Sequence, residues 1–327
     1  MLHGEKILVT GPAGQISLPL ARSLAGDNEV WGIGRFGDPG SREAVEAAGV
    51  TTRVCDLATG DFGDLPRDFT YLLHLATFRR GGLDYDGAMR VNAEGTALVL
   101  EHCRAVRAAL VMSTAEIYKP NADPWHAYRE TDPLGDVNSQ FDPTYSVSKI
   151  AEEAVARAWA RTAGVPVVIA RMNASYGPNG GLPAYHLDFI VSGATVHLRW
   201  DPIPYSPIHQ DDINAQTEAM LAAASVPATV VNWGGDEAVP AREWCAYFGE
   251  LTGIEPRIEV KELPGTLRGV VLDPTARQAI TGACTVGWRD GMRRLVEERY
   301  PGGVRPGGPV VGQAGRLLAA LESDPDA

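Results

Sequence analysis

The chain has 327 residues, of which 45% are hydrophobic and 21% are charged, and its 41 acidic against 29 basic residues give a formal net charge of −12. Such a length can bury the core of one large or two modest domains. The composition excludes a disordered chain and a collagen-like chain. The negative charge argues against a protein that binds a nucleic-acid backbone, because that binding needs clustered Lys and Arg. A local site for a single nucleotide stays open.

The cysteines and the apolar segments indicate the redox state and the cellular location that we expect for the protein. The four cysteines form no C-x-x-C pair and show no zinc spacing, so we expect reduced thiols and no metal site. No charged-then-apolar signal segment opens the sequence. No apolar run approaches the ~20 residues that cross a bilayer. We therefore expect a soluble, cytoplasmic protein that binds neither nucleic acid nor membrane.

Strand-like and helix-like segments alternate in the first half of the chain. Short apolar runs, such as residues 6–10 (KILVT), are typical of buried parallel strands. Strands are predicted at 6–10, 29–33, 51–55, 70–75, 109–113 and 166–171, and helices at 15–25, 41–48, 90–107 and 144–163. This alternation predicts an α/β protein with a doubly wound parallel (Rossmann) sheet and right-handed crossovers.

The pattern loosens in the second half of the chain. Residues 173–208 are rich in Gly, Pro, Asn and aromatic residues, and helical and strand-like segments then return. Helices are predicted at 184–193, 211–224, 240–252 and 287–299, and strands at 229–233 and 257–260. We predict a dinucleotide-binding domain from residues 1–172 plus 208–233, a smaller C-terminal substrate domain from 173–207 plus 234–300, and a C-terminal arm over 301–327.

The first candidate site is the glycine-containing turn at residues 11–17 (GPAGQIS), which follows a predicted strand and opens a predicted helix. Glycines at this place let the backbone turn tightly and approach a pyrophosphate that the helix N-terminus holds. Ser17 replaces the third glycine of the usual fingerprint and is still small enough for close helix–sheet packing. The predicted cofactor contacts of this turn are Gly11, Ala13, Gly14, Gln15 and Ile16.

The second candidate site follows the strand at 29–33. A carboxylate expected there would bind a free ribose 2′-hydroxyl, but the sequence has Arg35 and no acid before Asp38. A guanidinium pairs with a 2′-phosphate through charge-assisted hydrogen bonds, so Arg35 favours NADP over NAD. The alternatives are a solvated loop arginine, or an arginine that stacks on the adenine of NAD.

The third and fourth candidate sites combine into a proton-transfer group. Tyr145 and Lys149 are four residues apart on a predicted helix, so both project from one face, and the ammonium favours the phenolate. The chain has only four lysines, which makes a chance pairing rarer. Thr114 ends a predicted strand, where its hydroxyl could hold a reacting oxygen beside Tyr145. The alternative for Thr114 is a plain turn cap.

Together these motifs resemble the extended short-chain dehydrogenase/reductases, also called the NAD-dependent epimerase/dehydratase family, over about 300 residues. Further segments carry the same resemblance. They are Asp56-Leu57, His74-Leu75-Ala76-Thr77, Asn92 within 91–96, Arg171 with Tyr176-Gly177-Pro178, and His209-Gln210-Asp211-Asp212.

The resemblance implies roles for the matching residues. Tyr145 is the proton donor or acceptor, Lys149 supports its phenolate and binds the nicotinamide ribose, and Thr114 takes the catalytic Ser/Thr position. Asn92 is expected to be structural, and the segment with His209 and Asp212 is expected to join the two domains. The remaining implied cofactor contacts are Asp56, Leu57, Leu75, Ala76, Thr77 and Met172.

Three departures from the family pattern bear on the substrate. Ala115-Glu116 stands where sugar-nucleotide dehydratases carry Asp-Glu, which argues against dehydration. Ala174 replaces an Asn of many nucleotide-sugar members, and the stretch Pro204-Tyr205-Ser206-Pro207-Ile208 lacks the Arg-Asp that usually meets the diphosphate. Both changes weaken a nucleotide-sugar assignment. Positive charge could come instead from Arg79, Arg80 and Arg199.

We therefore expect an NAD(P)-dependent oxidoreductase that acts on a secondary alcohol or ketone, with a tyrosine as acid/base and NADP as the favoured cofactor. The alternative is an NAD-dependent epimerase of a nucleotide sugar or related carbohydrate, and a cofactor-sensing regulator without catalysis is a third possibility. The predicted helices 90–107 and 144–163 match the pair with which family members commonly build a homodimer.

Overall fold

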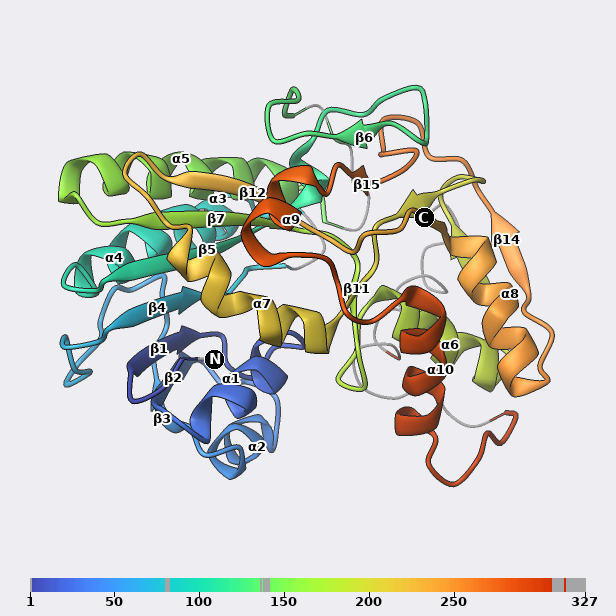
Figure 1. Ribbon diagram of the computed structural model, residues 1–327, viewed down its shortest axis with the longest axis horizontal. Helices are drawn as coiled ribbons and strands as arrows, with labels where there is room; N and C mark the ends of the chain where they lie inside the picture. The colour runs from blue at the N-terminus through green and yellow to red at the C-terminus, as the bar shows by residue number, and fades with distance from the viewer. Residues whose placement is uncertain (1, 80–82, 136, 138–141, 308–314, 316–327) are drawn as a thin grey trace.

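The computed structural model describes residues 2–79, 83–135, 137, 142–307 and 315. Its centre is a seven-stranded parallel sheet in the order β12-β7-β5-β4-β1-β2-β3 (Figure 1). The strands are β1 (Lys6–Thr10), β2 (Glu29–Gly34), β3 (Thr51–Val54), β4 (Tyr71–His74), β5 (Ala108–Thr114), β7 (Val167–Met172) and β12 (Thr229–Trp233). The predicted doubly wound parallel sheet is confirmed.

Helices cover both faces of the sheet, and the side chains that alternate along each strand fill two apolar layers, which together form the sheet core. On one face, Ile7 and Val168 pack with Leu20 of α1 (Ser17–Ala25) and Ile213 of α7 (Gln210–Ala222). The opposite layer lies under α4 (Gly95–His102) and α5 (Tyr145–Ala163), and it contains Leu8, Val111, Val167, Val99 and Ala156. Strands buried on both sides explain the continuous apolar runs in the sequence.

The predicted helix at 90–107 is wrong in its bounds and its continuity. The chain forms α3 (Tyr85–Met89), a π-helical turn (Arg90–Glu94) and α4, which ends at His102. Asn92 sits in the π turn and is buried, where its amide nitrogen donates to the Phe78 carbonyl at 3.1 Å and to the Ser148 hydroxyl at 2.9 Å. The π turn adds a residue to the helix, and such turns are frequent at functional sites. Asn92 thus joins the loop after β4 to α5.

A second core lies beyond the carboxyl end of the sheet, on the right in Figure 1. It is built around α6 (Leu182–Ser192), α8 (Ala241–Thr252) and α10 (Trp288–Arg299), with Trp244 and Phe248 fully buried. Short strand pairs surround these helices. They are β8 (Ser175–Tyr176) with β11 (Ile208–His209), β9 (Val196–Leu198) with β14 (Ile258–Val260), β10 (Pro204–Tyr205) with β13 (Val239–Pro240), and β6 (Ala127–Tyr128) with β15 (Val271–Leu272).

Two segments connect or flank the two cores. The helix α9 (Thr275–Thr281) packs near α7 and β12, and both Ile280 and Cys284 lie against the core of the large sheet. The small helix α2 (Ser41–Ala47) lies beside β3. Most of the predicted arm at 301–327 lies outside the described residues, but the Gly307 amide donates to the Val191 carbonyl at 3.0 Å. The predicted division into domains remains a prediction.

Candidate functional site

The predicted site residues gather at one edge of the sheet. Because the seven strands are parallel, their carboxyl ends meet at the same edge, where ligands of this fold bind. Six neighbouring strands each bring a predicted residue to that edge. These are Gly11 after β1, Arg35 after β2, Asp56 after β3, Leu75–Thr77 after β4, Thr114 at the end of β5 and Met172 at the end of β7.

The turn after β1 has the geometry that a pyrophosphate requires. Gly11 has a φ of +63°, and a Cβ there would come within 2.9 Å of the Ala76 Cα atom. A Cβ at Gly14 would come within 3.2 Å of the Gly11 carbonyl oxygen. The N-cap residue of α1, Ile16, provides no side-chain hydrogen bond to the first turn. The backbone can therefore approach a phosphate closely, and the residues present fit a dinucleotide.

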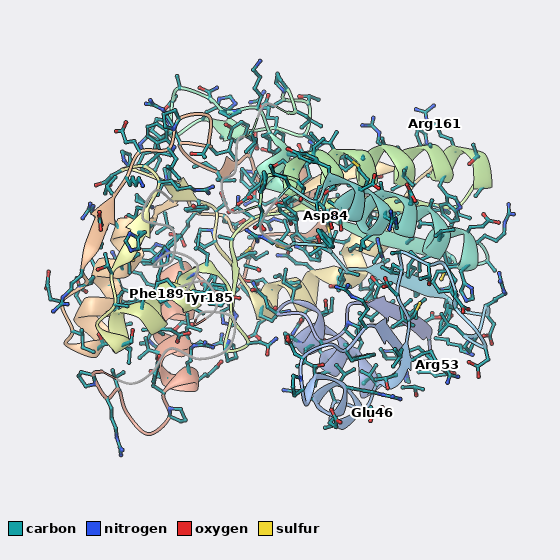
Figure 2. All side chains as sticks on the ribbon, turned by 180° about the vertical axis from the view of Figure 1, so that it is seen from behind. Glu46, Arg53, Asp84, Arg161, Tyr185 and Phe189 are labelled. Atoms are coloured by element: carbon teal, nitrogen blue, oxygen red, sulfur yellow. The ribbon has the colours of Figure 1, made fainter. Side chains whose placement is uncertain are left out.

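Gln15 has a further contact that the sequence did not predict. Its side-chain amide donates to the Ser175 hydroxyl at 2.9 Å and accepts from the Tyr185 hydroxyl at 2.9 Å. Tyr185 lies on α6 (Figure 2). The amide of Asn179 donates to the Gln15 carbonyl at 2.9 Å. The predicted pyrophosphate turn is therefore also a junction between the two cores.

A hydrogen-bonded chain fixes the end of β4 next to this turn. The hydroxyl of Thr96 donates to the Asn92 carbonyl at 2.6 Å, so it accepts from Nε2 of His74 at 2.7 Å. The Nδ1 atom of His74 then accepts from the Thr10 hydroxyl at 2.9 Å. Burial, reinforced by the charge of Lys149, lowers the pKa of His74 to about 3, so the ring is neutral.

The Thr10 end of this series of hydrogen bonds holds the backbone of Leu75 and Ala76, which we predict to contact the cofactor. The Thr10 hydroxyl oxygen accepts from the backbone amides of Leu75 and Ala76, both at 3.0 Å. His74 therefore positions this backbone and carries no charge of its own. The sequence pattern identified the segment, but it did not predict the chain of hydrogen bonds.

The residues predicted at the adenosine side differ in exposure. Arg35 is exposed at the end of β2, while Leu57 is buried after β3. The Asp56 carboxylate accepts from the Ala58 amide at 3.0 Å and so caps a turn. A charged group on a dinucleotide ribose could approach Arg35 from solvent.

Tyr145 is the first residue of α5 and has a cation beside its ring. The Arg79 guanidinium lies 4.9 Å from the ring centroid, within the range of a cation–π contact. Its Nε donates to the Asp142 carboxylate at 2.6 Å. Desolvation opposes the charge of Arg79, but Glu116, Tyr145 and Asp142 together raise its pKa. Arg79 is thus held as a cation next to the predicted acid/base.

Thr114 combines a turn cap with a place at the strand end. Its hydroxyl oxygen accepts from the Glu116 amide at 3.2 Å and caps the 3₁₀ turn Ala115–Ile117. The Ser146 hydroxyl donates to the Glu116 carbonyl at 2.7 Å, which ties this turn to the start of α5. The structure therefore brings the segments of Thr114 and Tyr145 together. The bond to Thr114 uses a lone pair, so its hydrogen can still be donated.

Lys149 is almost completely buried one helical turn after Tyr145. Its ammonium donates to the Met112 carbonyl at 2.6 Å and forms an ion pair with Glu152. Burial raises the pKa of Glu152 to about 7, against the opposing effect of Lys149. The sequence pattern identified Lys149, but nothing in it distinguished Glu152 as its partner.

A second buried ion pair clamps the strands behind the site. Arg171 of β7 makes two hydrogen bonds to the Glu153 carboxylate, at 2.9 and 2.8 Å, and another to the Tyr118 hydroxyl at 2.9 Å. The Ser113 hydroxyl donates to Glu153 at 2.6 Å. The pair thereby fixes the residue that precedes Thr114.

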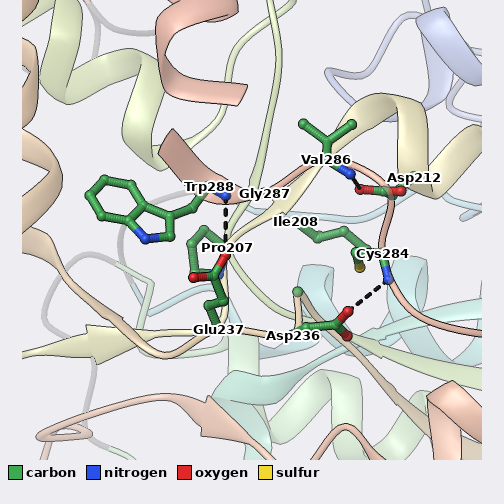
Figure 3. A pocket seen from close by; sticks show the side chains of 10 residues that line it. Pro207, Ile208, Asp212, Asp236, Glu237, Cys284, Val286, Gly287 and Trp288 are labelled. Carbon is green, nitrogen blue, oxygen red and sulfur yellow. Dashed lines mark hydrogen bonds between the residues drawn. The ribbon is translucent and has the colours of Figure 1, made fainter. Parts of the chain in front are cut away.

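The segment with His209 and Asp212 joins α7 to the chain before α10. The Asp212 carboxylate accepts from the amide and hydroxyl of Thr285, at 2.7 and 2.8 Å, and from the Val286 amide at 3.1 Å. Figure 3 shows Asp212 at the wall of a cavity of about 60 Å³. Asp236 in the same wall accepts from the Cys284 amide at 2.7 Å. These carboxylates are occupied by backbone amides, so they hold the segment before α10 against α7 and β12.

A larger, open cavity of about 350 Å³ lies at the surface beside the second core, between the loop near Asn121 and the segment at 262–268. The Arg268 guanidinium stacks 4.2 Å from the Trp200 ring on its wall. Arg199, the preceding residue, lies 3.9 Å from the Glu116 carboxylate. Arg199 therefore lies near the turn that Thr114 caps.

Two negative findings complete the description. Among the residues that the structure describes, no group of three or more His, Cys, Asp or Glu side chains could hold a metal ion. Within the same residues, every helix is too short or too polar to cross a membrane.

A doubly wound sheet with a glycine turn and a Tyr/Lys helix at its carboxyl edge defines a dinucleotide-binding protein of the short-chain dehydrogenase/reductase class. The profile of the family described as "NAD dependent epimerase/dehydratase family" matches residues 7–192. The chain belongs to this family, so the resemblance seen in the sequence is confirmed.

Curated relatives match part of the chain. A probable dTDP-glucose 4,6-dehydratase of Sinorhizobium fredii is 31% identical over 197 residues, which are 53% of this chain and 54% of that protein. The dTDP-glucose 4,6-dehydratase 1 of Escherichia coli is 28% identical over 201 residues, or 53% and 55% of the two chains. The chain thus spans about half the length of the curated relatives it matches.

Solved structures share the fold at greater length. A UDP-glucuronic acid 4-epimerase of Bacillus cereus, in complex with UDP-glucuronic acid and NAD, has a TM-score of 0.78 and 21% identity, with coverage of 90% of this chain and 99% of that one. A UDP-glucose 4-epimerase of Thermus thermophilus, in complex with NAD, has a TM-score of 0.74 and 24% identity, with coverage of 90% and 98%.

Dinucleotide binding at the turn after β1 can be tested by adding a side chain at Gly11. Gly11→Ala forces a left-handed residue and a methyl group against the Ala76 backbone, so we expect dinucleotide affinity to fall at least about tenfold. Gly26→Ala is the matched control, because a Cβ at Gly26 meets nothing within 4 Å. Calorimetric titration with NADH and NADPH, with circular dichroism for folding, measures both. Equal affinity in the folded Gly11→Ala variant contradicts a dinucleotide at this turn.

Proposed function

We propose that the protein is a nicotinamide-dinucleotide-dependent enzyme that oxidises a secondary hydroxyl of a nucleotide sugar or related carbohydrate and then reduces the ketone on its opposite face, which is epimerisation. The observation that carries the proposal is the joining of the Thr114 turn to the Tyr145 helix at the carboxyl edge of the sheet. Family membership and the UDP-sugar and NAD complexes of structural relatives support it.

In the proposed mechanism, residues at the carboxyl edge of the sheet transfer the substrate proton and bind the reacting oxygen. A bound nicotinamide supplies the acceptor and donor of a hydride. Tyr145 takes the hydroxyl proton of the substrate and later returns it. Thr114 donates a hydrogen bond to the same oxygen, and the Arg79 cation lies over the Tyr145 ring. Residues 11–16 and 75–77 hold the dinucleotide, and Lys149 supports it from α5.

The second core supplies features suited to the rest of the substrate. Arg268, which lies over the Trp200 ring, and Arg199 offer positive charge for a nucleotide diphosphate. These arginines compensate for the Pro204-Tyr205 departure, and the Tyr205 hydroxyl hydrogen-bonds Arg199. Residue 115 is an alanine, so no carboxyl group stands at the position that dehydration would require.

A second candidate function is net reduction of a ketone with NADP. The exposed Arg35 at the end of β2 favours it, because its charge suits a 2′-phosphate. NADPH commonly serves reductions, whereas an epimerase keeps its cofactor and cycles it.

We also propose that the protein is a homodimer that pairs through α4 and α5. Leu98 on α4 and Val147 on α5 are exposed by 40% and 41%. Apolar side chains on two neighbouring helices are suited to contact with a second copy.

The catalytic proposal is tested by Tyr145→Phe, which removes the phenolic hydroxyl and keeps the ring against Arg79. We expect turnover to fall by about 10²–10⁴-fold while dinucleotide affinity stays within about twofold. The assay uses a panel of UDP- and dTDP-sugars, with and without NADH or NADPH, and NMR identifies products. Inverted sugars support the epimerase and reduced products support the second candidate. Unchanged turnover in the variant refutes the role of Tyr145.

The role of Arg35 is tested by comparing cofactors. We expect the protein to bind NADPH about tenfold more tightly than NADH, and Arg35→Ala to abolish that difference. Arg42→Ala is a suitable control, because Arg42 is a neighbouring surface arginine on α2 that pairs with Glu46. Tighter binding of NADH by the unmodified protein contradicts the interpretation of Arg35 and removes the support for net reduction.

The homodimer is tested by light scattering during size exclusion. We expect the mass of two chains, and the mass of one chain for the double variant Leu98→Glu, Val147→Glu, because two buried charges per subunit oppose association. A single-chain mass for the unmodified protein at micromolar concentration removes the proposal.

A further inference from the structure

Gln15, in the turn that we predict to bind the pyrophosphate, uses both ends of its side-chain amide to bind the second core. The nitrogen donates to the Ser175 hydroxyl and the oxygen accepts from the Tyr185 hydroxyl, each at 2.9 Å. Ser175 and Tyr185 are 5% and 8% exposed. Both partners are thus buried, and a hydrogen bond that is shielded from water is stronger than the same bond at the surface.

The helix α6, which carries Tyr185, is also tied to α10. The Asp188 carboxylate of α6 accepts from Nε of Arg299 at 2.6 Å and from the Tyr300 hydroxyl at 2.9 Å. Arg299 is the last residue of α10, and it also donates to the Pro178 carbonyl at 2.7 Å, in the loop that leads into α6. This loop and α6 therefore belong to the second core.

The loop between β8 and α6 passes closely over the contact between Gln15 and Tyr185. Gly177 and Gly180 exchange two backbone hydrogen bonds, at 3.1 and 3.0 Å, which close the loop into a tight turn. Gly180 has a φ of +133°, and a Cβ there would come within 3.1 Å of the Tyr185 hydroxyl oxygen and 3.6 Å of Oε1 of Gln15. The close approach depends on the missing side chain at this position.

The same loop binds the backbone of the turn after β1. The side-chain amide of Asn179 donates to the Gln15 carbonyl at 2.9 Å and to the Gly14 carbonyl at 3.4 Å. In a trans peptide the carbonyl and the next amide point in opposite directions, so the amides of these two peptide groups are those of Gln15 and Ile16. Neither amide makes a backbone hydrogen bond within the described part of the chain. A phosphate at these amides polarises the peptide groups and strengthens their carbonyls as acceptors.

We propose that Gln15 is a positioning residue, through which a dinucleotide bound at the turn after β1 orders α6 and the loop before it. By linkage, order in the second core tightens dinucleotide binding by the same factor. Only the consequence for catalysis rests on the proposed function: the dinucleotide binds first and prepares the side of the crevice that receives the substrate.

The free energy of this coupling comes from conformational order. Without a ligand, an opening of α6 frees the side chain of Gln15 and its turn together, and the freed turn gains conformational entropy. A phosphate at the amides of Gln15 and Ile16 keeps the turn fixed when α6 opens, so no such gain offsets the lost hydrogen bonds. One hydrogen bond of this kind corresponds to about threefold to tenfold in an opening equilibrium.

The proposal is tested by hydrogen exchange with mass spectrometry, with the dinucleotide present and no substrate. In the unmodified protein, saturating NADH or NADPH is expected to slow amide exchange by about threefold to tenfold in both α1 and α6. Gln15→Leu keeps the backbone of the turn and removes both side-chain bonds, so the slowing should persist in α1 and fall below about twofold in α6. A purely structural role of Gln15 would change exchange equally with and without the dinucleotide.

Two tyrosine variants form a matched pair for this experiment. Tyr185→Phe removes the hydroxyl that binds Gln15 and changes no residue of the turn, so it should also reduce the slowing in α6. Tyr300→Phe removes a hydroxyl that binds α6 at Asp188 and does not touch Gln15. It should speed exchange in α6 by the same factor with and without the dinucleotide, so the slowing is kept.

The outcome that overturns the proposal is a slowing in α6 that survives in folded Gln15→Leu and Tyr185→Phe, or one that Tyr300→Phe removes equally. If Gln15→Leu does not fold, Tyr185→Phe decides alone.

The coupling and the proposed function can fail separately. A dinucleotide that slows exchange in α1 but not in α6 of the unmodified protein overturns the coupling and leaves the proposed function standing. Unchanged turnover in Tyr145→Phe refutes the role of Tyr145, whereas the exchange data still decide the coupling because they need no substrate. If neither NADH nor NADPH binds the unmodified protein, both proposals fall.

Discussion

The bidentate ion pair between Arg171 and Glu153 is the interaction on which the site depends. It joins β7 to α5 in the interior, and Glu153 also accepts from Ser113, the residue before Thr114. Removing one partner of such a pair leaves an uncompensated buried charge, at a cost of about 3–5 kcal/mol. That is a large part of the ~5–15 kcal/mol by which a domain is stable. The strand end and the helix start are thereby held in one arrangement.

The adjacent acids Glu152 and Glu153 on α5 have different partners. Glu153 is fully satisfied by Arg171 and Ser113, as expected for a structural charge. Among the described residues, Glu152 has its ion pair with Lys149 and no hydrogen-bond partner, and burial raises its pKa. The first acid therefore ties two strands to α5, while the second pairs with the lysine of the Tyr/Lys helix. Their difference arises from which strand each side chain meets.

Much of the fold could be predicted because its signals are local. Apolar runs identify strands buried on both sides, and the glycines at 11 and 14 identify a turn where backbone must pass closely. The four-residue spacing of Tyr145 and Lys149 puts both on one helix face. The π turn around Asn92 and the two-residue strands of the second core could not be predicted, because long-range hydrogen bonds create them.

The sequence by itself determined the class of sheet, the glycine turn and the family, since each follows from residue type and spacing along the chain. The tertiary structure decided the charges around Tyr145. Arg79, in a loop more than sixty residues before Tyr145, lies over the ring of that tyrosine. Lys149 contacts the Glu152 carboxylate and the Met112 carbonyl. The physical reason is that electrostatic effects depend on distance and burial in space, and sequence separation specifies neither.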